Sequence, residues 1–127
     1  MIQSGSWLNV IDNSGAKEVG IIQVLRGYRK RYAAVGDMAI CSVKSLRTNR
    51  REKSKIQKGD VLKALIVRTK VPIKTYGGDN MGFFENAAIL LSRQNKLLGT
   101  RVFGAVPKML RYTKFLRVVS LASGFIR

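Results

Sequence analysis

The stretch KGDVLKALIVRTK, from Lys58 to Lys70, decides the fold of this 127-residue chain. It opens on a Gly-Asp turn and continues through seven residues that include five large or branched apolar side chains. A short apolar run of this kind, bounded by turn signals, is typical of a strand buried on both faces. An unpaired buried charge is unfavourable. The strand is therefore expected to deliver Arg68 and Lys70, at its exit, to a surface.

Four other stretches have the pattern of strands, namely Trp7–Ile11, Lys17–Leu25, Met38–Leu46 and Ala87–Leu91. Simple alternation in the second of them places Val19 and Ile21 on one face and Ile22 and Val24 on the other. Five short strands separated by turn signals predict a mainly β fold, a small closed five-stranded β-barrel. Closure also removes the open sheet edges that a highly basic protein would otherwise expose.

Two segments outside these strands have other signals. Pro72 and the glycine-rich run at 77–80 predict a protruding β-ribbon at about 71–84. Pro107 suits the first turn of a helix, and apolar residues at three-four spacing up to Ala122 favour short helices over the alternative of a strand. We therefore expect a single domain over 1–127, with barrel and ribbon in 1–98 and a C-terminal loop and short helices in 99–127.

The charge balance indicates the partner. The chain has 24 Lys and Arg against 7 Asp and Glu, a net charge of +17. Such self-repulsion is tolerated when a polyanion neutralises it. Nothing in the sequence predicts a DNA-reading helix, whereas Arg and Lys suit phosphate groups. Tyr28, Tyr32 and Tyr76, near basic loops, either stack on unpaired bases or pack at the barrel rim. Shape- and phosphate-directed binding to structured RNA fits best.

The candidate RNA-binding side chains are the cations of the loops and strand ends. They are Lys17, Arg29, Lys30, Arg31, Lys44, Arg47, Arg50, Arg51, Lys53, Lys55, Arg68, Lys70, Lys74, Lys108, Arg111 and Lys114.

Catalysis is not expected. Histidine is absent and Cys41 is the single cysteine, so the commonest general base, a multi-thiolate metal site and an internal disulfide are all excluded. The four aspartates stand in turns, where carboxylates accept hydrogen bonds from backbone N–H groups. No two acids are spaced as a metal pair or an acid–base pair. We expect no catalytic residue, no metal, no cofactor and no small-molecule substrate, which disfavours the alternative of a nucleic-acid-processing enzyme.

A membrane role is also disfavoured. The chain has no continuous apolar run near the roughly 20 residues that a spanning helix needs. The N-terminal residues lack the basic and apolar regions of a secretory signal. The C-terminal segment is too short for a strongly amphipathic, membrane-surface helix.

Seven motifs follow one another along the chain: LNVIDNSGAK (8–17), RYAAVGD (31–37), KGDVLKA (58–64), VRTK (67–70), NAA (86–88), GTRVFG (99–104) and SLA (120–122). In this order they resemble the L-fourteen family of large-subunit ribosomal proteins in its bacterial or organellar form. The likeness runs from Met1 to about Ala122 with near-family spacing.

The resemblance implies a five-stranded barrel with a ribbon and short C-terminal helices. It implies a structural constituent of the large subunit that binds large-subunit rRNA and helps to form the interface and bridges to small-subunit rRNA. The implied protein neighbours are ribosomal proteins L-three and L-nineteen and, on the exposed surface, a ribosome silencing factor. Thr100, Arg101 and Ser120 match family positions on that surface and are candidate partner contacts.

The sequence departs from the family pattern at several places. The loop from Arg47 to Lys55 is longer and more basic, which predicts an added RNA contact. Gly77-Gly78 and Phe84-Glu85 each stand where the family has Asp-Gly, and the tail after Ala122 lacks the usual Pro-Glu. This drift with added charge favours a ribosome in the mitochondrial matrix, and a bacterial or plastid ribosome is the alternative.

Overall fold

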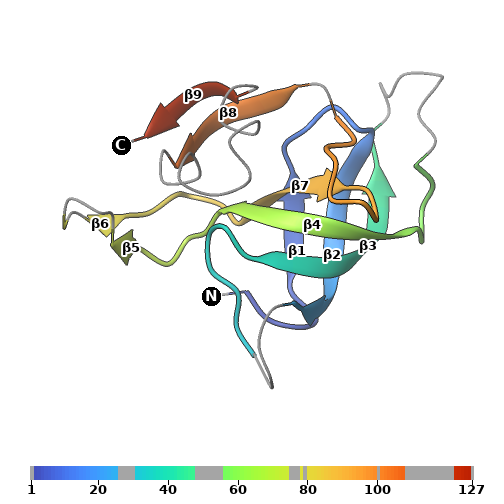
Figure 1. Ribbon diagram of the computed structural model, residues 1–127, viewed down its shortest axis with the longest axis horizontal. Coiled ribbons are helices and arrows are strands. Elements are labelled where there is room, and N and C mark those ends of the chain that lie inside the picture. Colours follow the sequence, from blue (N-terminus) through green and yellow to red (C-terminus); the bar gives the residue numbers. More distant parts are fainter. Residues whose placement is uncertain are drawn as a thin grey trace.

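Five strands of the computed structural model form a closed barrel in the spatial order β1-β2-β3-β4-β7 (Figure 1). The structure describes residues 2–25, 31–47, 56–74, 78, 80–99, 101–107 and 122–126. Neighbouring barrel strands are antiparallel, except that β1 and β7 pair in parallel and close the barrel. The predicted five-stranded barrel is confirmed, with strands β1 (Trp7–Val10), β2 (Ala16–Val24), β3 (Met38–Leu46), β4 (Val61–Arg68) and β7 (Ala87–Leu91).

Strand β4 is buried on both faces over its second half. Ala64 and Ile66 belong to the apolar cluster inside the barrel. Leu65 and Val67 point the other way and belong to a second cluster, which also contains Val102 and Val106 of strand β8 (Val102–Pro107). β8 covers the outer face of β4, so the apolar side chains on both faces of the strand are buried. The first half differs from the prediction, since Val61 is 54% exposed.

One extra residue in β2 changes the predicted alternation. Ile21 pairs with Cys41 and Gln23 pairs with Ile40, so two steps along β2 match one step along β3. Ile22 is therefore the bulged residue and is 49% exposed, whereas Val24 returns to the core. The prediction that Ile22 and Val24 share a face is wrong, because a bulge shifts every later side chain by one position.

The predicted ribbon is present and projects from the barrel at the left of Figure 1. It consists of β5 (Ile73–Lys74) and β6 (Asn80–Met81), which pair antiparallel.

The C-terminal segment differs from the prediction where the structure describes it. β8 (Val102–Pro107) pairs in parallel with β9 (Ala122–Ile126). Pro107 is the last residue of β8 rather than the first of a helix, and Ala122 opens a strand rather than ending a helix. The predicted helical positions at 108–121 lie outside the described residues. In the part of the chain that is described, no helix is long and apolar enough to cross a membrane.

The turn aspartates act as predicted at three positions. Asp37 Oδ2 accepts a hydrogen bond from Ala34 N at 2.8 Å, and Asp60 Oδ2 accepts one from Gln57 N at 2.9 Å. Asp12 Oδ1 accepts from Ser14 N at 3.2 Å and from Ser14 Oγ at 2.6 Å. Its other oxygen accepts from Leu90 N at 3.0 Å, so Asp12 also ties its turn to β7. Asp79 lies outside the described residues.

Candidate nucleic-acid interface

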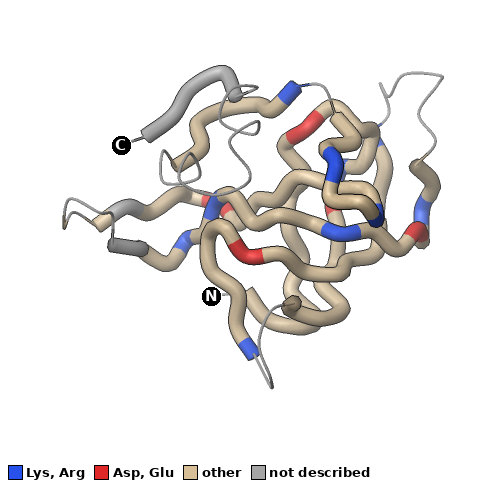
Figure 2. Tube along the Cα trace, viewed as in Figure 1, with Lys and Arg blue, Asp and Glu red and all other residues tan. Residues whose placement is uncertain are grey.

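The described candidate cations are distributed around the barrel rather than gathered on one strand. Lys17, Arg31, Lys44, Lys70 and Arg101 are exposed. Figure 2 shows Lys and Arg on several separate parts of the trace. Lys74 lies in the ribbon strand β5. The remaining candidates fall outside the described residues, namely Arg29, Lys30, Arg50, Arg51, Lys53, Lys55, Lys108, Arg111, Lys114, Thr100 and Ser120.

Arg47 follows β3 and is held against the barrel by its own chain. Its Nη2 donates to Val10 O at 2.6 Å and its Nε donates to Ala16 O at 3.3 Å. Its guanidinium carbon lies 6.0 Å from the centre of the Phe103 ring, within the range of a cation–π contact. The guanidinium plane is therefore fixed in place while the residue stays exposed.

Arg68, at the end of β4, is turned inward instead of out to solvent. Its Nε donates to Ala105 O at 2.8 Å and its Nη2 donates to Phe103 O at 2.6 Å. Its Nη1 forms an ion pair of 2.6 Å with Glu85, and the Arg68 side chain is only 11% exposed. Arg68 thus joins β8 to the barrel. Lys70, two residues later, is exposed as expected.

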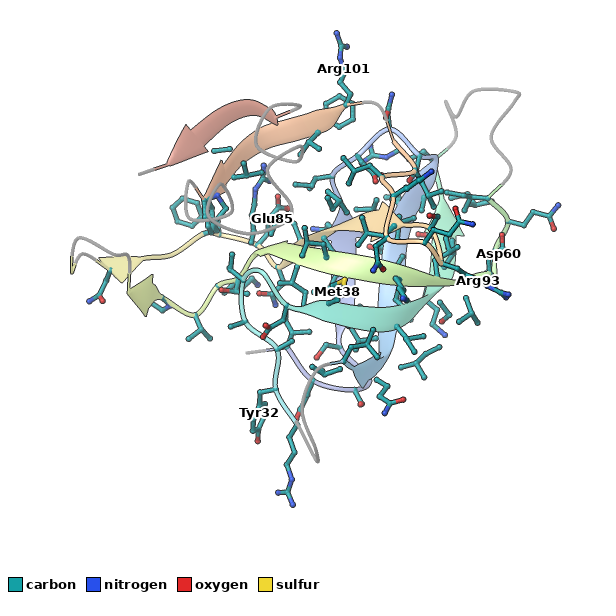
Figure 3. All side chains as sticks on the ribbon, in the orientation of Figure 1. Tyr32, Met38, Asp60, Glu85, Arg93 and Arg101 are labelled. Atoms are coloured by element: carbon teal, nitrogen blue, oxygen red, sulfur yellow. The ribbon has the colours of Figure 1, made fainter. Side chains whose placement is uncertain are left out.

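The two arginines line one open hollow. It has a volume of about 390 Å³ and is formed by Asn9, Val10, Ile11, Lys17, Arg47, Arg68, Glu85, Phe103 and Gly104. We call it the Phe103 pocket. Figure 3 shows Glu85 between the barrel and β8. Glu85 and Phe103 were not among the sequence candidates, and the only local signal at Glu85 was its departure from the family's Asp-Gly.

Three cations that were not sequence candidates, Lys63, Arg93 and Lys96, lie at or beside the turn after β7. The Lys63 ammonium group lies 3.2 Å from Asn95 Oδ1 and 3.5 Å from Arg93 O, which brings it to the turn after β7. Arg93 and Lys96 of that turn are exposed. Lys63 and Arg93 are 30 residues apart in the sequence, and the β4–β7 pairing brings Lys63 to the turn that contains Arg93.

Arg101 immediately precedes β8, beside the turn that contains Asp12 and Asn13. Its backbone N–H donates to Asn13 Oδ1 at 3.1 Å, and its side chain extends away from the molecule in Figure 3. Of the three candidate partner contacts, Arg101 is the one that the structure describes, and its residue is exposed.

Burial shifts the pKa of two groups, the Asp12 carboxyl and the Cys41 thiol. Burial raises the pKa of Asp12, although hydrogen bonds from Ser14 and Leu90 oppose the shift. Burial also raises the pKa of the Cys41 thiol to about 12, so that thiol is unreactive in the folded barrel. Among the described residues, no group of three or more His, Cys, Asp or Glu side chains could hold a metal ion.

The sequence matches the ribosomal protein L14p/L23e family over residues 1–126. The chain belongs to that family. The resemblance carried by the seven motifs is thereby confirmed. As a member of the L14p/L23e family the chain is a structural protein of the large ribosomal subunit, a class of protein that does not act by catalysis.

Proposed function

We propose that the chain binds large-subunit rRNA by neutralising its phosphates. The observation that carries this proposal is the charge balance. If each of the 7 acids paired with one cation, 24 − 7 = 17 cations would still lack an acidic counter-charge within the chain. Exposure of Lys17 on β2, of Lys44 on β3 and of Lys70, which follows β4, supports the proposal further. Phosphate groups of folded RNA supply the missing counter-charge.

The second part of the proposal concerns the surface around Arg101. Together with Thr100 and Ser120 it is proposed to face the small subunit, to take part in bridges to small-subunit rRNA and to receive a silencing factor. L-three and L-nineteen are the proposed protein neighbours. Exposure of Arg101 supports such a role, and the hydrogen bond from its backbone N–H to Asn13 holds its main chain at the turn.

The ribosome in question is proposed to be mitochondrial, with a bacterial or plastid ribosome as the alternative. The basis is the added charge of the 47–55 loop and the altered tail. Fractionation of the source cells tests this: the protein should be found with mitochondrial ribosomes, and its recovery with cytoplasmic or plastid ribosomes would refute it.

The RNA proposal is tested by measuring affinity for large-subunit rRNA across a salt series. Each neutralised phosphate contributes a slope of about −0.7 to −0.9 in a plot of log affinity against log salt. We expect affinity to fall by several decades between low and moderate salt, and the protein to co-sediment with large subunits at low ionic strength. A triple variant, Arg50→Gln, Arg51→Gln and Lys53→Gln, tests the basic loop.

Two results would refute the proposal. One is that the wild-type chain does not bind structured rRNA at low ionic strength. The other is a chain that sediments alone in extract. If the triple variant protects rRNA as well as wild type does, the 47–55 loop is not part of the RNA interface. The proposal for the other cations would then still stand.

A further inference from the structure

The Phe103 pocket combines three kinds of chemistry within about 390 Å³. Volumes of roughly 300–1,000 Å³ are usual for sites that hold small organic groups. Its walls come from distant parts of the sequence: Asn9 and Lys17 from the β1–β2 side, Arg47 after β3, Glu85 before β7 and Phe103 on β8. Hydrogen bonds from Arg47 and Arg68 join several of these segments to one another.

One wall offers flat surfaces. Phe103 is 42% exposed even though it lies beside the Arg47 guanidinium group. The guanidinium plane is fixed by its hydrogen bonds to the Val10 and Ala16 carbonyls. Unpaired RNA bases stack on both aromatic rings and arginine planes, and fixed groups lose little conformational entropy when they are used.

Glu85 gives the pocket hydrogen-bond acceptors. The Glu85 carboxylate is held by Arg68 Nη1 at 2.6 Å and by Asn9 Nδ2 at 3.0 Å. Each carboxylate oxygen has about two acceptor positions, so capacity remains after these contacts. The side chain is 39% exposed, and a ligand can reach it. A carboxylate in this position accepts from the amino group of a base, as it does from cytosine N4.

Lys17 supplies the third component, an exposed cation on the pocket wall. A nucleotide presents a flat face, an edge with a hydrogen-bond donor and a phosphate, and the pocket has a counterpart for each. An acidic peptide fits less well, since Glu85 would repel a carboxylate side chain.

We infer that the Phe103 pocket receives one unpaired RNA nucleotide. Its base stacks against Phe103 and Arg47, its amino group donates to Glu85 and its phosphate pairs with Lys17. This inference rests on the proposed binding of rRNA. It goes further by naming the pocket, the unpaired state of the base and a preference for cytosine over uracil, which lacks an exocyclic amino group.

The test has two parts on the full-length chain. The first is an NMR titration with cytidine and uridine monophosphates, in which cytidine monophosphate should shift the amide signals of Asn9, Arg47 and Phe103 at lower concentration. The second is rRNA affinity of Phe103→Leu, which keeps apolar volume but removes the ring. We expect a loss of about tenfold, the usual effect of deleting one base–aromatic stack. Trp7→Leu is the matched control, because Trp7 is exposed outside the pocket and should change affinity less than twofold.

Lys17→Gln provides a variant whose folding is not in question, because Lys17 is exposed. It should reduce the steepness of the plot of log affinity against log salt by about 0.7–0.9, the contribution of one phosphate contact. The inference is overturned if wild-type chain binds rRNA but Phe103→Leu and Lys17→Gln bind it equally well and cytidine monophosphate shifts no pocket signal. It is also overturned if an oligoglutamate peptide shifts those signals more strongly than the nucleotide does. If the pocket signals shift but rRNA does not bind, the pocket stands and the proposed function fails.

Discussion

Gly104 lies directly against the guanidinium group of Arg68. A Cβ atom built on Gly104 would overlap Arg68 Nη2, and the backbone there has a φ of +79°. The absence of a side chain at 104 is what allows Arg68 to reach the carbonyl groups of Phe103 and Ala105 on either side. Gly104 and Arg68 are therefore one unit that attaches β8 to the end of β4.

The first prediction is that Gly104→Ala destabilises the fold by about 3 kcal/mol. A positive φ costs an L-residue about 1–2 kcal/mol, and displacement of the Arg68 guanidinium group adds the loss of its hydrogen bonds. Unfolding by urea measures the change in free energy.

Gly59→Ala is the matched control for this prediction. Gly59 has a similar φ of +92°, but nothing lies within 4 Å of its added Cβ. It should show the backbone effect alone, about 1–2 kcal/mol. Equal losses in the two variants would mean that the Arg68 contact contributes nothing.

The second prediction concerns pH. Because burial raises the pKa of Asp12 above its ordinary value of 3.8, the folded chain holds this proton more tightly than the unfolded chain does. The stabilisation from the protonated carboxyl is present in full below pH 3.8, and it is lost as the pH rises through the higher pKa of the folded state. Asp12→Asn does not titrate. The free energy of unfolding of wild type minus that of Asp12→Asn should therefore decrease as pH rises from about 4.

Urea unfolding at a series of pH values measures this difference. Asp60→Asn removes an acid from another turn and serves as the comparison for a general change in charge. A wild-type advantage that grows with pH would show that the hydrogen bonds from Ser14 and Leu90 outweigh burial.

The third prediction uses the buried thiol. Cys41 is 0% exposed, and its pKa is raised to about 12, so it reacts only when the barrel opens. For a domain with about 5 kcal/mol of stability, alkylation should be at least a thousandfold slower than in the urea-unfolded chain. Mass spectrometry after timed exposure to iodoacetamide gives both rates. Rapid alkylation of the native chain would contradict the position of Cys41 in the core.

Local sequence was enough to locate the barrel strands. The turn-bounded apolar run around Leu65 and Ile66 predicted β4 because alternation and branching act over a few residues. The bulge at Ile22 could not be found in this way, because it is defined by the register against β3. The helix predicted to begin at Pro107 is wrong at that residue for a similar reason. The preference of Pro107 for a first helical turn is weak, and the parallel pairing of β8 with β9 decides its conformation.

The roles of the cations were harder to predict than the strands. Arg47 and Arg68 have the same local signal as Lys17 or Lys70, a cation at or near a strand end. Their acceptors, Val10 O and Ala105 O, are each 37 residues away in the sequence. Only the assembled barrel shows which cations are held by acceptors within the chain.

The last prediction separates these two kinds of cation. Arg68→Lys should destabilise the fold by about 2 kcal/mol, because one ammonium group cannot replace three directed contacts to Glu85, Phe103 and Ala105. Lys70→Gln is its counterpart on the surface and should change stability by less than about 0.5 kcal/mol. If Lys70 contacts a phosphate, the same variant lowers the salt slope of rRNA binding by about 0.7–0.9. Urea unfolding and a salt series on both variants distinguish the roles. Weaker rRNA binding by Arg68→Lys with unchanged unfolding would assign Arg68 to the RNA instead of to β8.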